Sequence, residues 1–118
     1  MEDSNLKVTL RRIDEYIAEQ QEHIKRGKEL EQLRTNPAFL SVFVDGYINT
    51  EAEKLFNILV DPTGVSPYSD EEIRLKLASI SDFKRYINNV EISAEQAQNK
   101  IAREELERVR VTAIGTGE

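Results

Sequence analysis

Carboxylates are the side chains of this 118-residue chain best suited to acid–base or metal chemistry, since it has 22 Asp plus Glu, one His and no Cys. The lack of Cys excludes thiol nucleophiles, thiolate zinc sites and disulfides. One His cannot supply the two ligands of a zinc-binding helix. His23 lies among charged residues with no partner nucleophile in view. We therefore expect it to be a solvent-exposed helix residue.

The segment that begins at Asp61 has the length of a calcium-binding loop, because a count of twelve residues places Glu72 at the last ligand position. The other ligand positions do not fit this interpretation. Thr63 and Val65 stand where acids are needed, and Ser66 stands where the turn needs Gly. We interpret Glu72 as a residue of a helix N-terminus and predict no metal site.

The remaining motifs also favour a non-catalytic protein. Gly115-Thr116-Gly117 is not followed by the Lys and helix of a phosphate-binding loop. Almost every carboxylate lies within four residues of Lys or Arg or at a predicted helix start, where a solvated structural role suffices. The sequence therefore predicts no enzyme activity, no catalytic residue and no cofactor.

The net charge of −6 is concentrated in the middle of the chain. Residues 35–72 contain one basic and seven acidic residues, whereas the segments on either side are nearly neutral. The basic pairs Arg11-Arg12, Lys25-Arg26 and Lys84-Arg85 are each offset by nearby acids. This distribution does not favour nucleic-acid binding, which needs a basic face.

Two long segments have the apolar spacing of amphipathic helices. Residues 5–34 form the first predicted helix, which Ser4 or Asn5 caps, and its stripe alternates steps of four and three with Gln20 in an a position, at Leu6, Leu10, Ile13, Ile17 and Ile24. Gly27 is predicted to break this pattern. Residues 69–110 form the second, which Ser69 and Glu72 cap, with a possible break at Asn88-Asn89 or Ser93.

Between them we expect two short apolar helices, over residues 37–47 and 50–60, and a loop over residues 61–68. Asn36-Pro37 is typical of a helix start. Gly46 predicts a bend near residues 46–49, and Thr50 with Glu53 has the spacing of a capping box. Asp61-Pro62-Thr63-Gly64 opens the loop. Residues 111–118 lose the apolar spacing and are predicted to be a flexible tail.

These elements predict one all-α domain over residues 1–110, with two long coiled-coil-like helices in an antiparallel arrangement, joined by the bent apolar pair and the Pro/Gly loop. In the predicted seam, one helix contributes Leu6, Leu10, Ile13 and Ile17, and the other contributes Ile80, Phe83, Ile87 and Val90. The aromatic residues Phe39, Phe43, Tyr47 and Phe56 are the candidate interaction residues. They either form ordinary core or dock a partner.

A string of residues between about 30 and 90 resembles small, helical, mostly uncharacterised proteins encoded among the structural genes of tailed bacteriophages. It comprises Asn36-Pro37-Ala38-Phe39, Asp45-Gly46-Tyr47, Glu51-Ala52, Leu55, Leu59, Asp61-Pro62, the acidic helix start and Phe83-x-x-Tyr86-Ile87. The resemblance implies a phage-encoded virion component or head-assembly accessory. It transfers no catalytic residues.

Two long helices closed by short ones bury their apolar stripes incompletely, so we expect a homo-oligomer that contacts another phage structural protein or a host protein. An acidic inhibitor or adaptor of a host protein and a small-terminase-like DNA-packaging component are the alternatives. No apolar run approaches the roughly 18–20 residues that span a bilayer, and the acidic start lacks the features of a secretory signal. We expect the cytoplasm of the host cell, or the virion, as its location.

Overall fold

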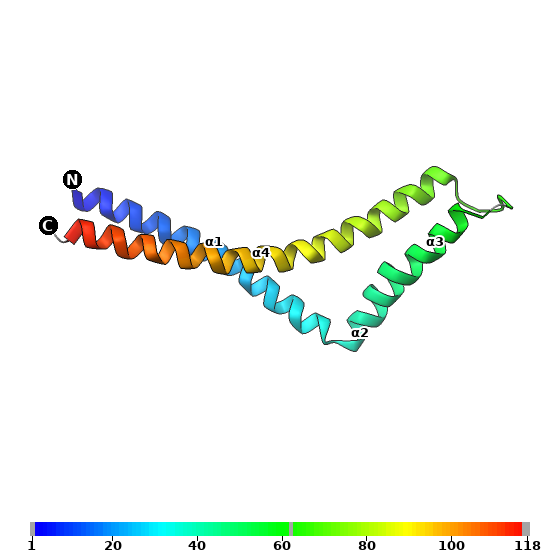
Figure 1. The fold of residues 1–118 in the computed structure, drawn as a ribbon, viewed down its shortest axis with the longest axis horizontal. Helices are drawn as coiled ribbons and strands as arrows, with labels where there is room; N and C mark the ends of the chain where they lie inside the picture. The colour runs from blue at the N-terminus through cyan, green and yellow to red at the C-terminus, as the bar shows by residue number, and fades with distance from the viewer. Residues whose placement is uncertain (1, 62, 117–118) are drawn as a thin grey trace. The chain divides into compact units, whose positions relative to one another are not determined.

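The computed structural model describes residues 2–61 and 63–116, and every regular element within them is a helix. These elements are α1 (Glu2–Arg34), α2 (Pro37–Phe39), the π-helix η1 (Leu40–Glu51), α3 (Ala52–Leu59) and α4 (Asp70–Thr116), as Figure 1 shows. The predicted all-α class with two long helices is confirmed. The chain divides into two compact units, Met1–Glu29 with Val90–Glu118, and Leu30–Asn89.

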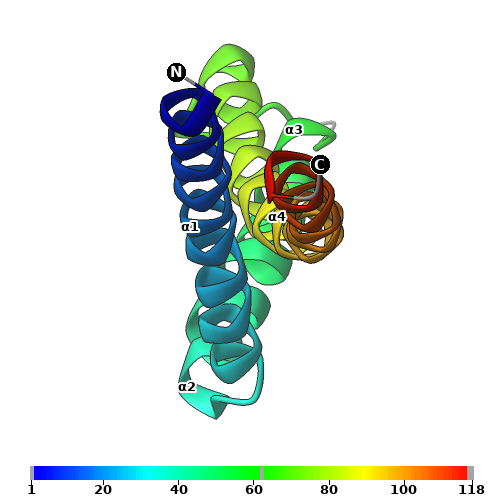
Figure 2. The ribbon, with the colours of Figure 1, turned by 90° about the vertical axis from the view of Figure 1, so that its left-hand side faces the viewer.

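In the first unit, α1 and the last part of α4 run side by side in opposite directions (Figures 1 and 2). Three contacts fix the pairing: Gly27 with Ala94, Asp14 with Arg108, and Leu6 with Gly115. Steps of 13 and 8 residues along α1 are matched by steps of 14 and 7 along α4. The near-constant register over these contacts is that of a regular antiparallel helix pair, as the sequence predicts.

Burial in this unit follows alternating steps of three and four on both helices. On α1 the buried and half-buried residues include Leu6, Leu10, Ile13, Ile17, Gln20, Ile24 and Gly27. On α4 they include Ala94, Ala97, Ile101, Glu104, Arg108 and Val111. The predicted α1 stripe is confirmed. Gly27 still belongs to this stripe, but the next buried residue is Leu30 rather than Glu31, so the phase changes after Gly27 as the sequence predicts.

The predicted partners of the α1 stripe are not those found. Leu6 lies against Gly115, and Asp14 pairs with Arg108, so the first turns of α1 meet the last turns of α4. Of the four α4 residues predicted for the seam, only Val90 belongs to this unit, whereas Ile80, Phe83 and Ile87 belong to the second. The apolar spacing fits several offsets equally well, and the small residues Gly27 and Ala94 favour this one by allowing close approach.

The second unit is an antiparallel arrangement in which α3 and the end of η1 pack on the first turns of α4. Its core consists of Leu55, Ile73 and Ile80, which are 2%, 0% and 5% exposed. Partly buried residues around them are Tyr47, Ala52, Ile58, Leu59 and Leu77. Ser69 caps α4 as predicted, because its Oγ accepts a hydrogen bond of 3.1 Å from the backbone N–H of Glu72.

Residues 37–59 form one continuous helical segment rather than two helices. Asn36 caps its start as predicted, since its Oδ1 accepts hydrogen bonds from the N–H groups of Ala38 (2.9 Å) and Phe39 (3.2 Å). The predicted bend at Gly46 and the predicted capping box at Thr50 are wrong. Backbone hydrogen bonding continues through both positions as η1, and Glu51, which precedes α3, has helical dihedral angles and no side-chain cap bond.

Each long helix extends beyond its predicted limits at one end. Helix α1 begins at Glu2, before the predicted caps Ser4 and Asn5. Helix α4 continues through Asn88-Asn89 and Ser93 and reaches Thr116, so the predicted flexible tail is helical over residues 111–116. Half-buried Val111 and the contact of Leu6 with Gly115 extend the helix pairing into this segment. Residues 117–118 of the predicted tail lie outside the described residues.

Candidate interaction surface

An aromatic cluster in the second unit contains three of the four candidate interaction residues. The ring of Phe43 lies between Phe39 and Phe83, with centroid distances of 5.4 Å and 5.9 Å. Tyr47 meets Phe83 edge to face at 5.6 Å, with an interplanar angle of 80°. These separations are within the range of favourable aromatic pairs. We call Phe39, Phe43, Tyr47 and Phe83 the aromatic cluster.

Three rings of this cluster lie on one face of the continuous helical segment over residues 37–59. Phe39, Phe43 and Tyr47 repeat at steps of four, close to one helical turn each. The half-buried pairs of residues 47–48 and 51–52 continue the same spacing.

Gly46 lies close to the backbone of the preceding turn of η1. A Cβ atom at position 46 would lie 3.1 Å from the carbonyl oxygen of Ser41, five residues earlier, which is a tight contact. The helix nevertheless continues through this position, where the sequence predicts a bend.

The aromatic cluster is open to solvent on one side. A cleft of about 560 Å³ is lined by Val42, Phe43, Gly46, Tyr47, Glu51 and Phe83. Val42 is 60% exposed and Phe43 is 44% exposed. The other aromatic residues of the cluster, Phe39, Tyr47 and Phe83, are half-buried. The lining is apolar except for Glu51, which gives the cleft one acidic edge. Such a surface suits an apolar side chain of a protein partner.

Phe56, the fourth candidate, does not join the aromatic cluster. It lies on α3 and is 56% exposed, while its neighbour Leu55 occupies the core. Val60, one helical turn later, is also 56% exposed. Phe56 is therefore a separate exposed apolar residue of the second unit. Sequence spacing does not show which of Leu55 and Phe56 is buried in the core and which is exposed, because the two residues are adjacent and similarly apolar.

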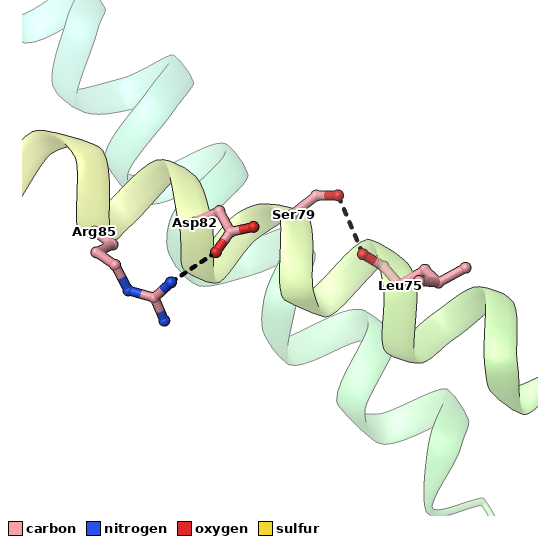
Figure 3. A network of polar contacts seen from close by, with 4 residues as sticks. All are labelled: Leu75, Ser79, Asp82 and Arg85. Atoms are coloured by element: carbon pink, nitrogen blue, oxygen red, sulfur yellow. Dashed lines mark hydrogen bonds and ion pairs between the residues drawn. The ribbon is translucent and has the colours of Figure 1, made fainter.

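Polar contacts in the second unit are mostly local to one element. On α4, Arg85 donates to Asp82 at 2.9 Å and the Ser79 hydroxyl donates to the Leu75 carbonyl at 3.1 Å (Figure 3). Both side chains of the ion pair are about 70% exposed, so it adds little to the free energy of unfolding. These are contacts of a solvated helix face rather than of a reaction site.

Among the residues that the structure describes, two groups have a shifted pKa, and both are exposed. The backbone N–H and the hydroxyl of Thr63 donate to Asp61 at 3.0 Å and 2.9 Å and lower the pKa of that carboxyl group. The hydrogen bond and charge of Glu107 raise the pKa of the Arg110 guanidinium. His23 is exposed on α1, as the sequence predicts. Among the described residues, no group of three His, Asp or Glu is placed to hold a metal ion.

Gly27, Ala94 and Ala97 are small residues that bring the two helices of the first unit close together. Ala97 is fully buried between the helices of the first unit, and Gly27 lies against Ala94. The spacing of the two alanines on α4 continues at Ile101 and Glu104, which are half-buried in the same stripe.

Comparisons with known protein families, with curated proteins and with solved structures gave no match to the chain. None of the described helices is long and apolar enough to span a membrane. The fold and the exposed aromatic cluster therefore provide the grounds for a functional proposal.

Proposed function

We propose that this protein is a non-enzymatic helical interaction protein, encoded by a tailed bacteriophage and associated with the virion or with head assembly. It acts by self-association and by contacts with other proteins. The observation that carries this proposal is the large apolar surface left exposed. The phage origin comes from the sequence resemblance over residues 30–90.

The exposed apolar surface supports self-association. Each of the two units exposes large apolar side chains, which a protein interface could bury. Only seven hydrophobic side chains of the described residues are buried, whereas large apolar side chains such as Leu75, Leu106 and Ile114 are 63–74% exposed.

The aromatic cluster is the proposed contact with a partner protein. Aromatic residues at the centre of an interface contribute strongly to binding, and Phe43 is both exposed and held in place by two neighbouring rings. The excess of acidic residues around this segment favours a partner with a basic rim. A partner subunit of the same assembly, presenting an apolar side chain with Lys or Arg around it, fits this description.

The test combines the molar mass of the purified chain with its presence in phage particles. Light scattering at micromolar concentration is expected to give a multiple of 13.6 kDa, and mass spectrometry of purified particles is expected to detect the chain. Phe43→Asp is expected to abolish incorporation into particles. Tyr86→Asp is the matched control, because Tyr86 is 58% exposed in the same unit and is not part of the aromatic cluster.

Three outcomes would contradict the proposal. A mass equal to one chain at all concentrations removes self-association. A chain absent from particles and assembly intermediates, yet bound to a purified host protein, identifies a host-directed adaptor instead. Retention on DNA that falls steeply with salt identifies a DNA-packaging component.

A further inference from the structure

The last part of α4 carries a second apolar stripe that α1 does not cover. Its residues follow steps of four, three and four and are Ala102, Leu106, Val109 and Ala113. Leu106 is 73% exposed, Val109 is 67% exposed, and both alanines are exposed. We call this set the outer stripe. It belongs entirely to the first unit.

The outer stripe and the α1-facing stripe lie on different faces of α4. Ala97 and Ile101, which face α1, are fully buried and half-buried. Ala102 follows Ala97 by five residues, and Leu106 follows Ile101 by the same interval. Five residues of an α-helix correspond to a rotation of about 140° around the axis. A helix with two apolar stripes this far apart can pack on two neighbours at once.

We propose that the outer stripe binds the outer stripe of a second copy of this chain, with the two α4 helices parallel. The flanking charges identify this occupant. With Leu106 in an a position and Val109 in a d position, Glu105 occupies a g position and Arg110 an e position. In a parallel pair, the g residue of one helix faces the following e residue of the other. Each Glu105 thus meets Arg110 of the other copy, twice in the dimer.

The antiparallel alternative is disfavoured by the same charges. It would bring e positions together, and both e residues of this segment are arginines, Arg103 and Arg110. Arg110 already donates to Glu107 of its own helix at 2.8 Å. Its planar guanidinium has five N–H donors, so a second carboxylate can bind at the same time. The parallel arrangement is therefore the one that pairs Glu105 with Arg110 and keeps the arginines of the two helices apart.

Asn99 adds a further reason for a parallel pair. It is exposed and lies seven residues before Leu106, in the preceding a position. A single Asn in an a position meets its own counterpart in a parallel dimer and fixes the register and the number of chains. Antiparallel packing would instead place this amide opposite a d position. The amide pair and the Glu105–Arg110 pair thus select the same arrangement.

This inference rests on the proposed self-association and names the surface that carries it. Leu106→Lys in the full chain is expected to raise the dissociation constant of the dimer by about tenfold or more, because two leucine side chains lose their burial. Leu75→Lys is the matched control, since Leu75 is 63% exposed on the same helix but lies in the second unit. Sedimentation equilibrium measures both dissociation constants, and circular dichroism checks that helix content is retained.

The outcomes separate the two proposals. A wild-type chain that stays monomeric overturns both of them. A wild-type oligomer with the same dissociation constant as Leu106→Lys overturns only the outer stripe as its interface.

The orientation is tested with single cysteines, which the natural chain lacks. Ala102→Cys and Ala113→Cys are each expected to form a disulfide-linked dimer alone, because d meets d and a meets a in a parallel pair. Ala78→Cys, an exposed alanine of α4 in the second unit, is the control for random collision. Dimers that form only when the first two variants are mixed would establish the antiparallel arrangement and overturn the parallel one.

Charge reversal provides an independent readout. Glu105→Arg alone places two arginines together and is expected to weaken association, and adding Arg110→Glu is expected to restore it. Association that is unchanged by Glu105→Arg would overturn the Glu105–Arg110 contact.

Discussion

Gly27 of α1 and Ala94 of α4 lie so close together that a Cβ atom at position 27 would be 2.4 Å from the Cβ atom of Ala94. No real pair of carbon atoms packs at that distance. The two helices of the first unit therefore depend on the absence of a side chain at residue 27. Both residues belong to the stripes that face each other in this unit.

Gly27→Ala is expected to destabilise the protein, although Ala is the better helix former by about 1 kcal/mol. Because both clashing atoms are directly attached to backbone, the helices must separate, and overpacking of this kind costs about 1–3 kcal/mol. Urea unfolding followed by circular dichroism measures the change. The double variant with Ala94→Gly is expected to return close to the wild-type free energy of unfolding.

Gly115→Ala is the matched control for this effect. Its Cβ atom would lie 2.8 Å from Cδ2 of Leu6, which is the far end of a flexible side chain. Leu6 can change rotamer, so a much smaller loss of stability is expected than for Gly27→Ala. Equal losses for the two variants would contradict the role given to Gly27.

The helix caps lead to a second prediction. Asn36→Ala removes the acceptor of two backbone N–H groups and is expected to cost about 1 kcal/mol of unfolding free energy. Thr50→Ala is expected to cost nothing or to stabilise slightly, because Thr50 lies inside η1 and Ala is the better helix former. A loss at Thr50 as large as that at Asn36 would indicate that a helix starts at residue 50 after all.

Local spacing predicts the elements of this fold better than their pairing. The α1 stripe and the caps at Asn36 and Ser69 depend on residues within one or two turns, so the sequence predicts them correctly. The seam partners of α1 depend on which of several equivalent offsets the long α4 helix adopts. The contact between Gly27 and Ala94 favours one offset, and neither residue is informative by itself because small residues also occur at helix breaks.

The aromatic cluster contains three candidate residues from the sequence and one residue, Phe83, that local spacing does not place there. Phe39, Phe43 and Tyr47 repeat at steps of four, which suffices to place them on one face. Phe83 was assigned to the seam because its spacing from Ile80 and Ile87 fits that stripe. Its stacking on Phe43 joins two residues that lie 40 positions apart in the sequence, which local spacing does not predict. Long π-helices are rare, and a Gly at position 46 more commonly indicates a bend.

Asp61 leads to a prediction about pH. Thr63→Ala removes the hydroxyl donor but keeps the backbone N–H, the larger cause of the lowered pKa, so the pKa of Asp61 is expected to rise only part of the way to its ordinary value. A carboxyl group with a lowered pKa in the folded state stabilises the protein above the pKa of its unfolded state. That stabilisation is lost as pH falls through the folded-state pKa. The free energy of unfolding of Thr63→Ala is therefore expected to depend less on pH in this acidic range than that of the wild type.

The side-chain carboxyl resonance of Asp61, followed by NMR during a pH titration, measures this pKa. The matched control is Ser66→Ala, because Ser66 lies in the same loop and its hydroxyl accepts from the N–H of Tyr68 rather than binding Asp61. Its titration curve for Asp61 is expected to match that of the wild type. An unchanged Asp61 pKa in Thr63→Ala would show that the hydroxyl contributes nothing.

Phe83 of α4 connects this helix to η1, since its ring meets both Phe43 and Tyr47. Phe83→Ala is expected to cost about 2–4 kcal/mol of unfolding free energy, through lost burial and two lost ring contacts. Tyr86→Ala, one turn later and 58% exposed, is expected to cost less than about 1 kcal/mol. Thermal unfolding compares the two variants, and hydrogen exchange of the amides in residues 40–51 locates the effect. Because Phe83 contacts the inner face of η1, exchange there is expected to accelerate only in Phe83→Ala, and equal protection in both variants would disprove this coupling.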